Sequence, residues 1–175
     1  TGDLLHFYWR AADGWKVENL SVAAGPKVEG PPVSVADMPG MIGAEVLMAK
    51  GPEEQLLAFT EATQPPWQWL AYNMTLGPDR TIAGPLATWR TYDNPDTRVY
   101  THLAGPATNG DLLHFWWGRD SGSQLPFSFE NVSTITGQKV QGEPAPYVTS
   151  WGADHEAEHV AARSHANDLL VFWDV

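Results

Sequence analysis

Asp111-Leu112-Leu113-His114-Phe115 decides the fold of this chain, because the chain repeats it. The other copies are Asp3-Leu4-Leu5-His6-Phe7, Gln55-Leu56-Leu57-Ala58-Phe59 and Asp168-Leu169-Leu170-Val171-Phe172. The spacings between successive copies are 52, 56 and 57 residues. Self-similarity at a nearly fixed period is typical of proteins built from structural repeats.

Two further markers follow the first three copies in constant order. The first ends in Asn-x-Ser or Asn-x-Thr, and its copies are Glu18–Ser21, Tyr72–Thr75 and Glu130–Ser133. The second contains a Gly, and its copies are Val28–Pro31, Ile82–Pro85 and Val140–Glu143. Three markers in the same order establish the repeat.

The sequence of each repeat, about 55 residues long, predicts four antiparallel strands. The chain has 16 Gly and 14 Pro, as expected for many short strands joined by turns. Leu4–Trp9 and Leu112–Trp117 are apolar on both faces, which suits a sheet packed between two others. The expected hairpin partners upstream are Val46–Lys50, Val99–Leu103 and His159–Arg163. The expected strands downstream are Trp15–Ser21, Trp67–Thr75 and Phe127–Ser133, followed by others at Val33, Leu86–Trp89 and Tyr147–Trp151. No stretch has a convincing helical period.

The predicted fold is therefore all-β, with the strands arranged as blades of a β-propeller. The 175 residues form one repetitive domain. We expect a half blade at residues 1–21, blades at about 22–75 and 76–133, and an incomplete blade at 134–175. Propellers typically need four to eight blades to close. We therefore expect a homo-oligomer or the remainder of a longer propeller to complete the ring, and no stable isolated monomer.

A β-trefoil or prism fold is the alternative, because three repeats of four strands also describe a trefoil of similar length. The fourth copy of the Asp-Leu-Leu strand argues against it, since a three-fold closed domain does not need one. A repeated Gln-x-Trp motif, typical of trefoil lectins, is also absent.

The motif order resembles the blades of fucose-lectin-like and tachylectin-like propellers. It runs from a V-x-A-x hairpin strand through D-L-L-x-F-x-W to W-x-x-E-N-L-S, as in Trp15–Ser21. This resemblance implies a carbohydrate-binding, lectin-like protein with repeated sites for glycans, fucosylated ones included. We also expect an extracellular location. The alternative is a protein-interaction or targeting module. Such a module could be a segment of a larger propeller protein.

Sugar binding needs aromatic platforms and forked polar groups. The candidate ligand-binding residues are Trp9, Arg10, Glu18, Trp117, Arg119, Glu130 and Arg163. In the second repeat, Glu61 replaces Trp and Tyr72 replaces Glu, so that repeat is the least suited to bind. Ordinary surface charge and Trp packing between blades are the competing interpretations for each residue taken alone.

Other polar patterns are interpreted as structural. Asp154–His159 is dense in potential metal ligands, but an exposed acidic turn is the preferred interpretation, and we predict no metal and no cofactor. The Asn-x-Ser/Thr copies match the glycosylation pattern, yet their recurrence at one position favours a local hydrogen bond. His6 and His114 are replaced by Ala58 and Val171, which favours packing over catalysis. No phosphate loop or G-x-S-x-G elbow is found, and we predict no enzymatic activity.

Charge and hydropathy restrict the partners. The net charge of −11 argues against nucleic acid, whose phosphates such a surface would repel. No apolar run approaches the roughly 18 residues of a membrane span. The absence of Cys excludes disulfides and thiolate metal sites, and it leaves the redox compartment undetermined.

Overall fold

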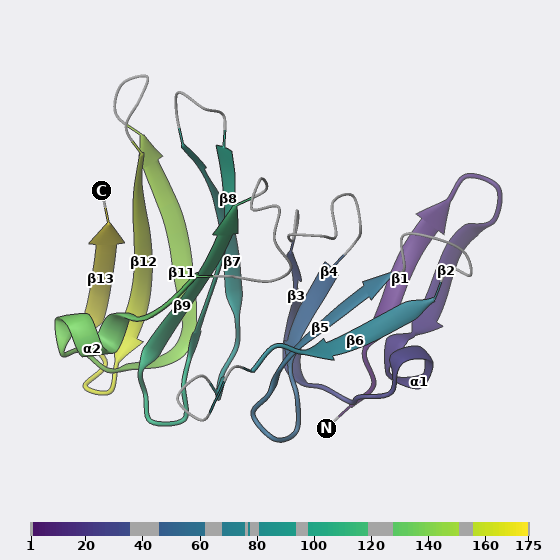
Figure 1. Ribbon diagram of the computed structural model, residues 1–175, viewed down its shortest axis with the longest axis horizontal. Coiled ribbons are helices and arrows are strands. Elements are labelled where there is room, and N and C mark those ends of the chain that lie inside the picture. The colour runs from purple at the N-terminus through teal and green to yellow at the C-terminus, as the bar shows by residue number, and fades with distance from the viewer. Residues whose placement is uncertain are drawn as a thin grey trace.

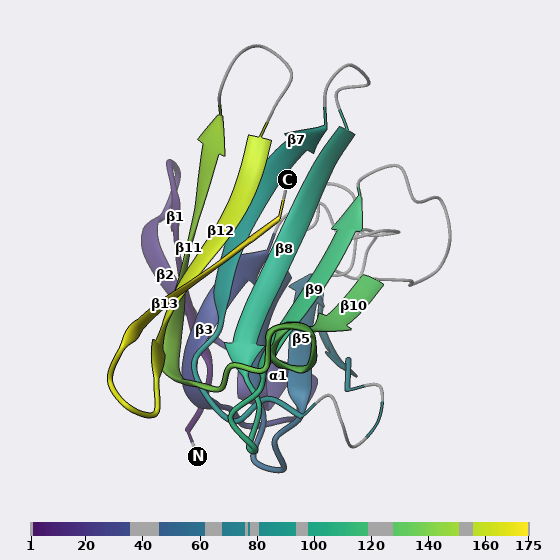
Figure 2. The same cartoon turned by 90° about the vertical axis from the view of Figure 1, so that its left-hand side faces the viewer.

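The computed structural model describes residues 2–35, 46–61, 68–75, 77, 81–93, 98–118, 128–150 and 156–174. This part of the chain is all-β. Four antiparallel sheets follow one another in chain order and lie side by side, from the purple N-terminal sheet to the yellow C-terminal one (Figures 1 and 2). No described helix is long and apolar enough to cross a membrane.

Within each sheet, strands that are consecutive in the chain pair with each other. The first sheet pairs β1 (Leu5–Arg10) with β2 (Gly14–Asn19). The second contains β3 (Glu29–Val35), β4 (Val46–Lys50), β5 (Leu56–Glu61) and β6 (Trp69–Asn73). The third contains β7 (Ala87–Asp93), β8 (Arg98–Pro106), β9 (Leu112–Gly118) and β10 (Ser128–Asn131). The fourth contains β11 (Val140–Ser150), β12 (Glu156–Ser164) and β13 (Leu169–Asp174). The described strands form no closed barrel, which the trefoil alternative would require.

The repeated sequence has a repeated register. In the first three sheets, the second Leu of the Asp-Leu-Leu motif or its Gln55 variant lies opposite the Asn of the following marker, as Leu5–Asn19, Leu57–Asn73 and Leu113–Asn131. The next positions then face each other as His6–Glu18, Ala58–Tyr72 and His114–Glu130. Positions in different sheets can therefore be compared one by one.

The core lies between the sheets. Because successive side chains of a strand point to opposite faces, β5 contributes to two different cores. Leu57 and Phe59 pack toward the first sheet, in a cluster that includes Leu4 and Leu20. Leu56 and Ala58 pack toward the third sheet. On the third sheet itself, Leu113, Phe115 and Trp117 face back toward the second sheet, and Leu112 faces the fourth.

The outward faces of the first and last sheets are apolar and exposed. Phe7 is 63% exposed, whereas the equivalent Phe115 is 1% exposed between two sheets. At the other end, Leu169 is 76% exposed, whereas the equivalent Leu112 is 1% exposed. The first and last sheets thus expose apolar faces that are equivalent to buried faces of the inner sheets.

Hydroxyl groups of the Asn-x-Ser/Thr markers join two strands of each sheet. Ser21, Thr75 and Ser133 accept hydrogen bonds from the backbone N–H groups that open the Leu-rich strands, those of Leu4, Leu56 and Leu112, at 3.0, 2.8 and 2.8 Å. The Asn side chains add a second link in two of the repeats. Asn19 Nδ2 donates to Asp3 and Asn131 Nδ2 to Asp111, at 2.7 and 2.8 Å. These bonds provide the structural role that the sequence predicts for the motif.

Two one-turn helices, α1 (Leu20–Ala24) and α2 (Val132–Thr136), begin at these markers. The sequence predicts strand up to Ser21 and Ser133 and no helix, so this expectation is wrong. The reason is that the Asn oxygen caps a helical turn: Asn19 Oδ1 accepts from the Val22 N–H, and Asn131 Oδ1 from the Thr134 N–H, both at 3.0 Å. The strands therefore end at the Asn.

We expect Ser133→Ala to lower the free energy of unfolding by about 1–3 kcal/mol, because the buried N–H of Leu112 loses its acceptor. Thr134→Ala, at the exposed neighbouring position, is the control and should have a much smaller effect. Urea unfolding followed by Trp fluorescence measures both. Equal midpoints for the two variants would contradict this role of the hydroxyl.

Candidate functional site

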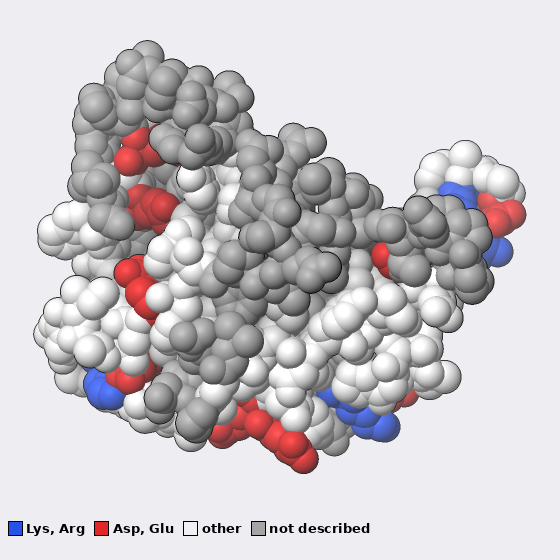
Figure 3. Space-filling model, in the orientation of Figure 1, with Lys and Arg blue, Asp and Glu red and all other residues white. Residues whose placement is uncertain are grey.

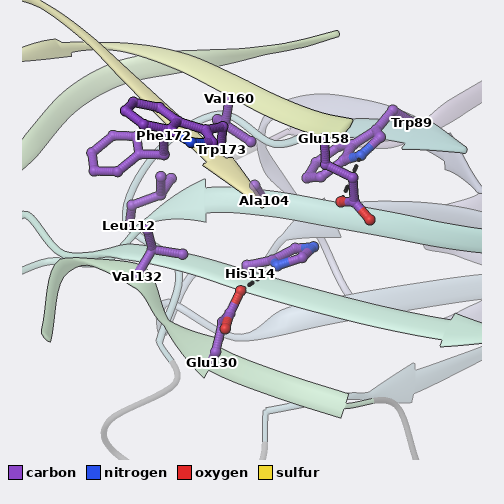
Figure 4. A pocket seen from close by; sticks show the side chains of 10 residues that line it. All are labelled: Trp89, Ala104, Leu112, His114, Glu130, Val132, Glu158, Val160, Phe172 and Trp173. Atoms are coloured by element: carbon purple, nitrogen blue, oxygen red, sulfur yellow. Dashed lines mark hydrogen bonds and ion pairs between the residues drawn. The ribbon is translucent and has the colours of Figure 1, made fainter. Parts of the chain in front are cut away.

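A pocket lies between the third and fourth sheets (Figure 4). Its lining combines polar and apolar side chains. The polar groups come from Trp89, His114, Glu130 and Glu158, and Phe172 is one of the apolar side chains. Its volume is about 70 Å³, which is room for a few water molecules. The pocket therefore joins carboxylates and an imidazole to an apolar wall.

Two imidazoles and a carboxylate meet beside this pocket. His102 is on β8, His114 on β9 and Glu158 on β12. The Nδ1 atom of His102 lies 3.0 Å from Nε2 of His114 and 3.1 Å from Oε2 of Glu158. The fourth sheet thus supplies the acid, and the third sheet supplies both imidazoles.

Outer hydrogen bonds orient these three side chains. The Thr91 hydroxyl lies 2.8 Å from Nε2 of His102. His114 Nδ1 lies 2.8 Å from Oε1 of Glu130, its opposite residue on β10. The indole N–H of Trp89 donates to Oε2 of Glu158 at 3.2 Å.

Stacked aromatic rings hold the imidazoles in place. Trp89 stacks on His102 with ring centroids 5.0 Å apart, and His102 stacks on His114 at 5.3 Å. Trp116 continues the series against His114 at 4.9 Å. These ring contacts restrict the rotation of both imidazoles.

His102 is held in its neutral form. Burial, with a smaller contribution from the His114 imidazole, lowers the pKa of His102 from the ordinary 6.5 to about 3. The short contact between His102 and Glu158 therefore joins a neutral imidazole to a carboxylate at neutral pH.

A second, wider hollow adjoins the pocket on the side of α2 and β13. It shares Glu130, Phe172 and Trp173 with the inner pocket and has a volume of about 390 Å³, which is within the range of small-molecule sites. The Trp173 indole is 69% exposed. Glu130 is bound to His114 through Oε1, and Oε2 makes no hydrogen bond to the described residues.

A related cluster lies between the first and second sheets. Glu18 accepts hydrogen bonds from the Tyr8 hydroxyl at 3.1 Å and from the Trp69 indole at 2.9 Å, and His6 lies 3.7 Å away. Burial raises the pKa of Glu18, but the hydrogen bonds from Trp69 and Tyr8, with the nearby His6, outweigh it and leave the pKa below its ordinary value. The guanidinium of Arg10 lies 4.9 Å from the centre of the Tyr8 ring. This cluster has one imidazole where the other has two.

The fourth sheet repeats part of the arrangement. The Thr149 hydroxyl lies 2.8 Å from Nε2 of His159, and Tyr147 stacks on that imidazole at 4.6 Å, as Thr91 and Trp89 do around His102. Val171, however, occupies the position of His114. Nδ1 of His159 is buried with no hydrogen-bond partner among the described residues.

The residues proposed from the sequence are dispersed over the structure. Glu130 lies at the pocket, and Glu18 and Arg10 lie beside Tyr8. Trp117 is buried in the core, and Trp9 is exposed on the outward face of the first sheet. Arg163 is exposed on β12, and Arg119 lies outside the described residues. Among the described residues, no arginine lines the pocket.

Sequence reasoning missed the contributions of His102 and Trp89 and assigned His114 to packing. A signal was present: the aromatic-x-Thr pattern of Trp89–Thr91 followed by His102 recurs as Tyr147–Thr149 followed by His159. Recurrence of a His at equivalent positions of the two strands would have indicated that this position is polar in both repeats.

The sequence matches no protein-family model and no curated protein. Among solved structures, the chain is similar to a fucose lectin from Kordia zhangzhouensis, whose structure was determined in complex with methyl-fucoside. The TM-score is 0.52 at 13% identity, and the similarity covers 82% of this chain and 92% of the lectin. At this identity the similarity establishes a shared lectin-like, all-β fold.

We expect His102 to make the protein less stable in acid. The unfolded chain binds a proton at His102 below pH 6.5, whereas the folded chain does not until about pH 3. Stability is therefore full above pH 6.5 and falls by up to about 1.4 kcal/mol per pH unit between these values. Charged or titratable groups facing the ring are His114 and Glu158, with Tyr100 beside it.

Urea unfolding of the wild type and His102→Asn between pH 4 and pH 8 measures this contribution. The difference in unfolding free energy between the two proteins should shrink as the pH falls. Parallel curves would contradict the lowered pKa.

Proposed function

We propose that this protein binds carbohydrate, and that the pocket between the third and fourth sheets, with the adjoining hollow, is a ligand site. One observation carries the proposal: Glu130 and the exposed Trp173 indole line the same hollow of about 390 Å³. One carboxylate oxygen of Glu130 makes no hydrogen bond to the described residues. Sugar sites need such an apolar ring face and nearby acceptors for hydroxyl groups.

The shared fold with a fucose lectin supports this class of ligand, and fucosylated glycans are the first to test. The related cluster around Glu18 supports repeated sites, because His6 and Glu18 face each other as His114 and Glu130 do. Individually weak sites on one protein would together bind multivalent glycans with higher avidity. We further propose an extracellular location, where such glycans are displayed.

We also propose that the four sheets are successive blades of a β-propeller completed by further blades. The outward faces support this: Phe7 and Trp9 on the first sheet occupy the positions of the buried Phe115 and Trp117 on the third. A following blade would cover Leu169 and Val171 on the last sheet. Either a second copy of the chain, joined head to tail, or the remainder of a longer propeller would bury both faces.

Binding of methyl-fucoside and of a glycan array by the tag-free protein tests the carbohydrate proposal. We expect Trp173→Ala and Glu130→Gln each to weaken binding by about tenfold or more, since each removes one of the two contacts that define the site. Tyr92→Ala, an exposed aromatic residue outside the pocket, is the control and should bind as the wild type does. Absence of binding to every glycan, fucosides included, would overturn the proposal.

Light scattering and thermal melting of the 175-residue chain test the assembly. We expect no compact, cooperatively melting monomer, because both end faces would expose apolar surface of the kind that marks interfaces. If copies associate, Phe7→Lys should shift the distribution toward smaller species, whereas Val22→Lys, exposed on α1, should not. A stable wild-type monomer would contradict the proposal.

A further inference from the structure

We propose that His102, His114 and Glu158 bind one divalent transition-metal ion, with Zn²⁺ as the best-fitting ion. One ligand atom from each residue lies within 4.8 Å of the others. The sequence predicts no metal site and interprets Asp154–His159, the segment that contains Glu158, as an exposed acidic turn. The proposal is independent of carbohydrate binding, since it concerns the ion alone.

Two of the three separations between the ligand atoms are close to those that a shared ion requires. Tetrahedral bonds of 2.0–2.1 Å separate two ligand atoms by about 3.3 Å. His102 Nδ1 lies 3.0 Å from His114 Nε2 and 3.1 Å from Glu158 Oε2. Small rotations of the side chains would open these separations to the required value.

The outer hydrogen bonds direct the correct nitrogen atoms inward. A metal-bound His usually donates its other N–H to a carboxylate or another acceptor. His114 has Glu130 at its outer nitrogen, which favours the proton there and a lone pair on the inner Nε2. Thr91 can accept from the outer nitrogen of His102 in the same way. Two lone pairs and a carboxylate then converge, and a cation satisfies all three.

The donor set and the surroundings select the class of ion. Two imidazoles and one carboxylate suit Zn²⁺ and similar ions, whereas Mg²⁺ and Ca²⁺ prefer oxygen ligands alone. His114 and Glu158 also line the pocket, so a fourth coordination position would open into it. Acidic side chains gather on the left-hand side of the face in Figure 3, over the third and fourth sheets, and their field attracts cations.

The fourth sheet supplies a matched control. His159 has the same stacked aromatic ring and the same Thr partner as His102, but Val171 stands where the second imidazole would be. A His159→Asn variant therefore removes a similar imidazole without removing a proposed ligand.

Titration of the tag-free, chelator-treated chain with Zn²⁺ in a calorimeter tests the proposal without any glycan. We expect saturation at one equivalent per chain. Glu158→Gln and His102→Asn should raise the Kd at least tenfold, and His159→Asn should leave it unchanged. Co²⁺ should give the intense visible absorption of a tetrahedral site in the wild type and lose it in Glu158→Gln. Circular dichroism establishes that each variant is folded.

Glu158→Gln keeps an acceptor for the Trp89 indole, so it tests the ligand set even if His102→Asn unfolds. Two results would overturn the proposal: no saturable Zn²⁺ binding by the folded wild type, or equal affinity in the wild type and Glu158→Gln. The first would mean that a proton shared along His114, His102 and Glu158 holds the cluster together. Neither result bears on glycan binding, which the fucoside titration decides separately.

Discussion

A side-chain hydroxyl that accepts one backbone N–H is the interaction on which the repeat depends. Ser21, Thr75 and Ser133 each tie the end of the last strand in a sheet to the start of the strand before it. This bond fixes which residues face each other across the two strands. The opposition of His114 and Glu130 follows from it, because a shift by one residue would move each side chain to the other face. The hydrogen bond between the Ser133 hydroxyl and the backbone of Leu112 lies outside the pocket, yet it helps to set the polar contact between His114 and Glu130 inside it.

The alternation of side chains then assigns each strand to two cores. One face of the third sheet packs on the second sheet, and the other face, with His102 and His114, packs on the fourth. A site between sheets can thus combine residues that belong to different repeats. The same alternation leaves the first and last sheets with one apolar face each that nothing in the described chain covers.

Much of the strand pattern could be predicted from the sequence, because three markers recur in a constant order and fix which strands are equivalent. The His114–Glu130 pair was also within reach, since both residues occupy marker positions. The contact between His102 and Glu158 was not, because it depends on how closely two sheets pack. The one-turn helices were missed for a local reason: a single capping Asn ends a strand without any helical period in the sequence.

The two boundaries of the third sheet, with the second sheet and with the fourth, differ in polarity at equivalent positions. By register, Val46 on the second sheet occupies the position of His102 on the third, and Ala58 occupies that of His114. Val46 and Ala58 are fully buried in an apolar core, so this fold packs without polar groups at either position. Burying two imidazoles and a carboxylate costs desolvation that Val and Ala avoid. The polar groups between the third and fourth sheets are therefore not needed for packing, and the ligand sites proposed above would give them a role.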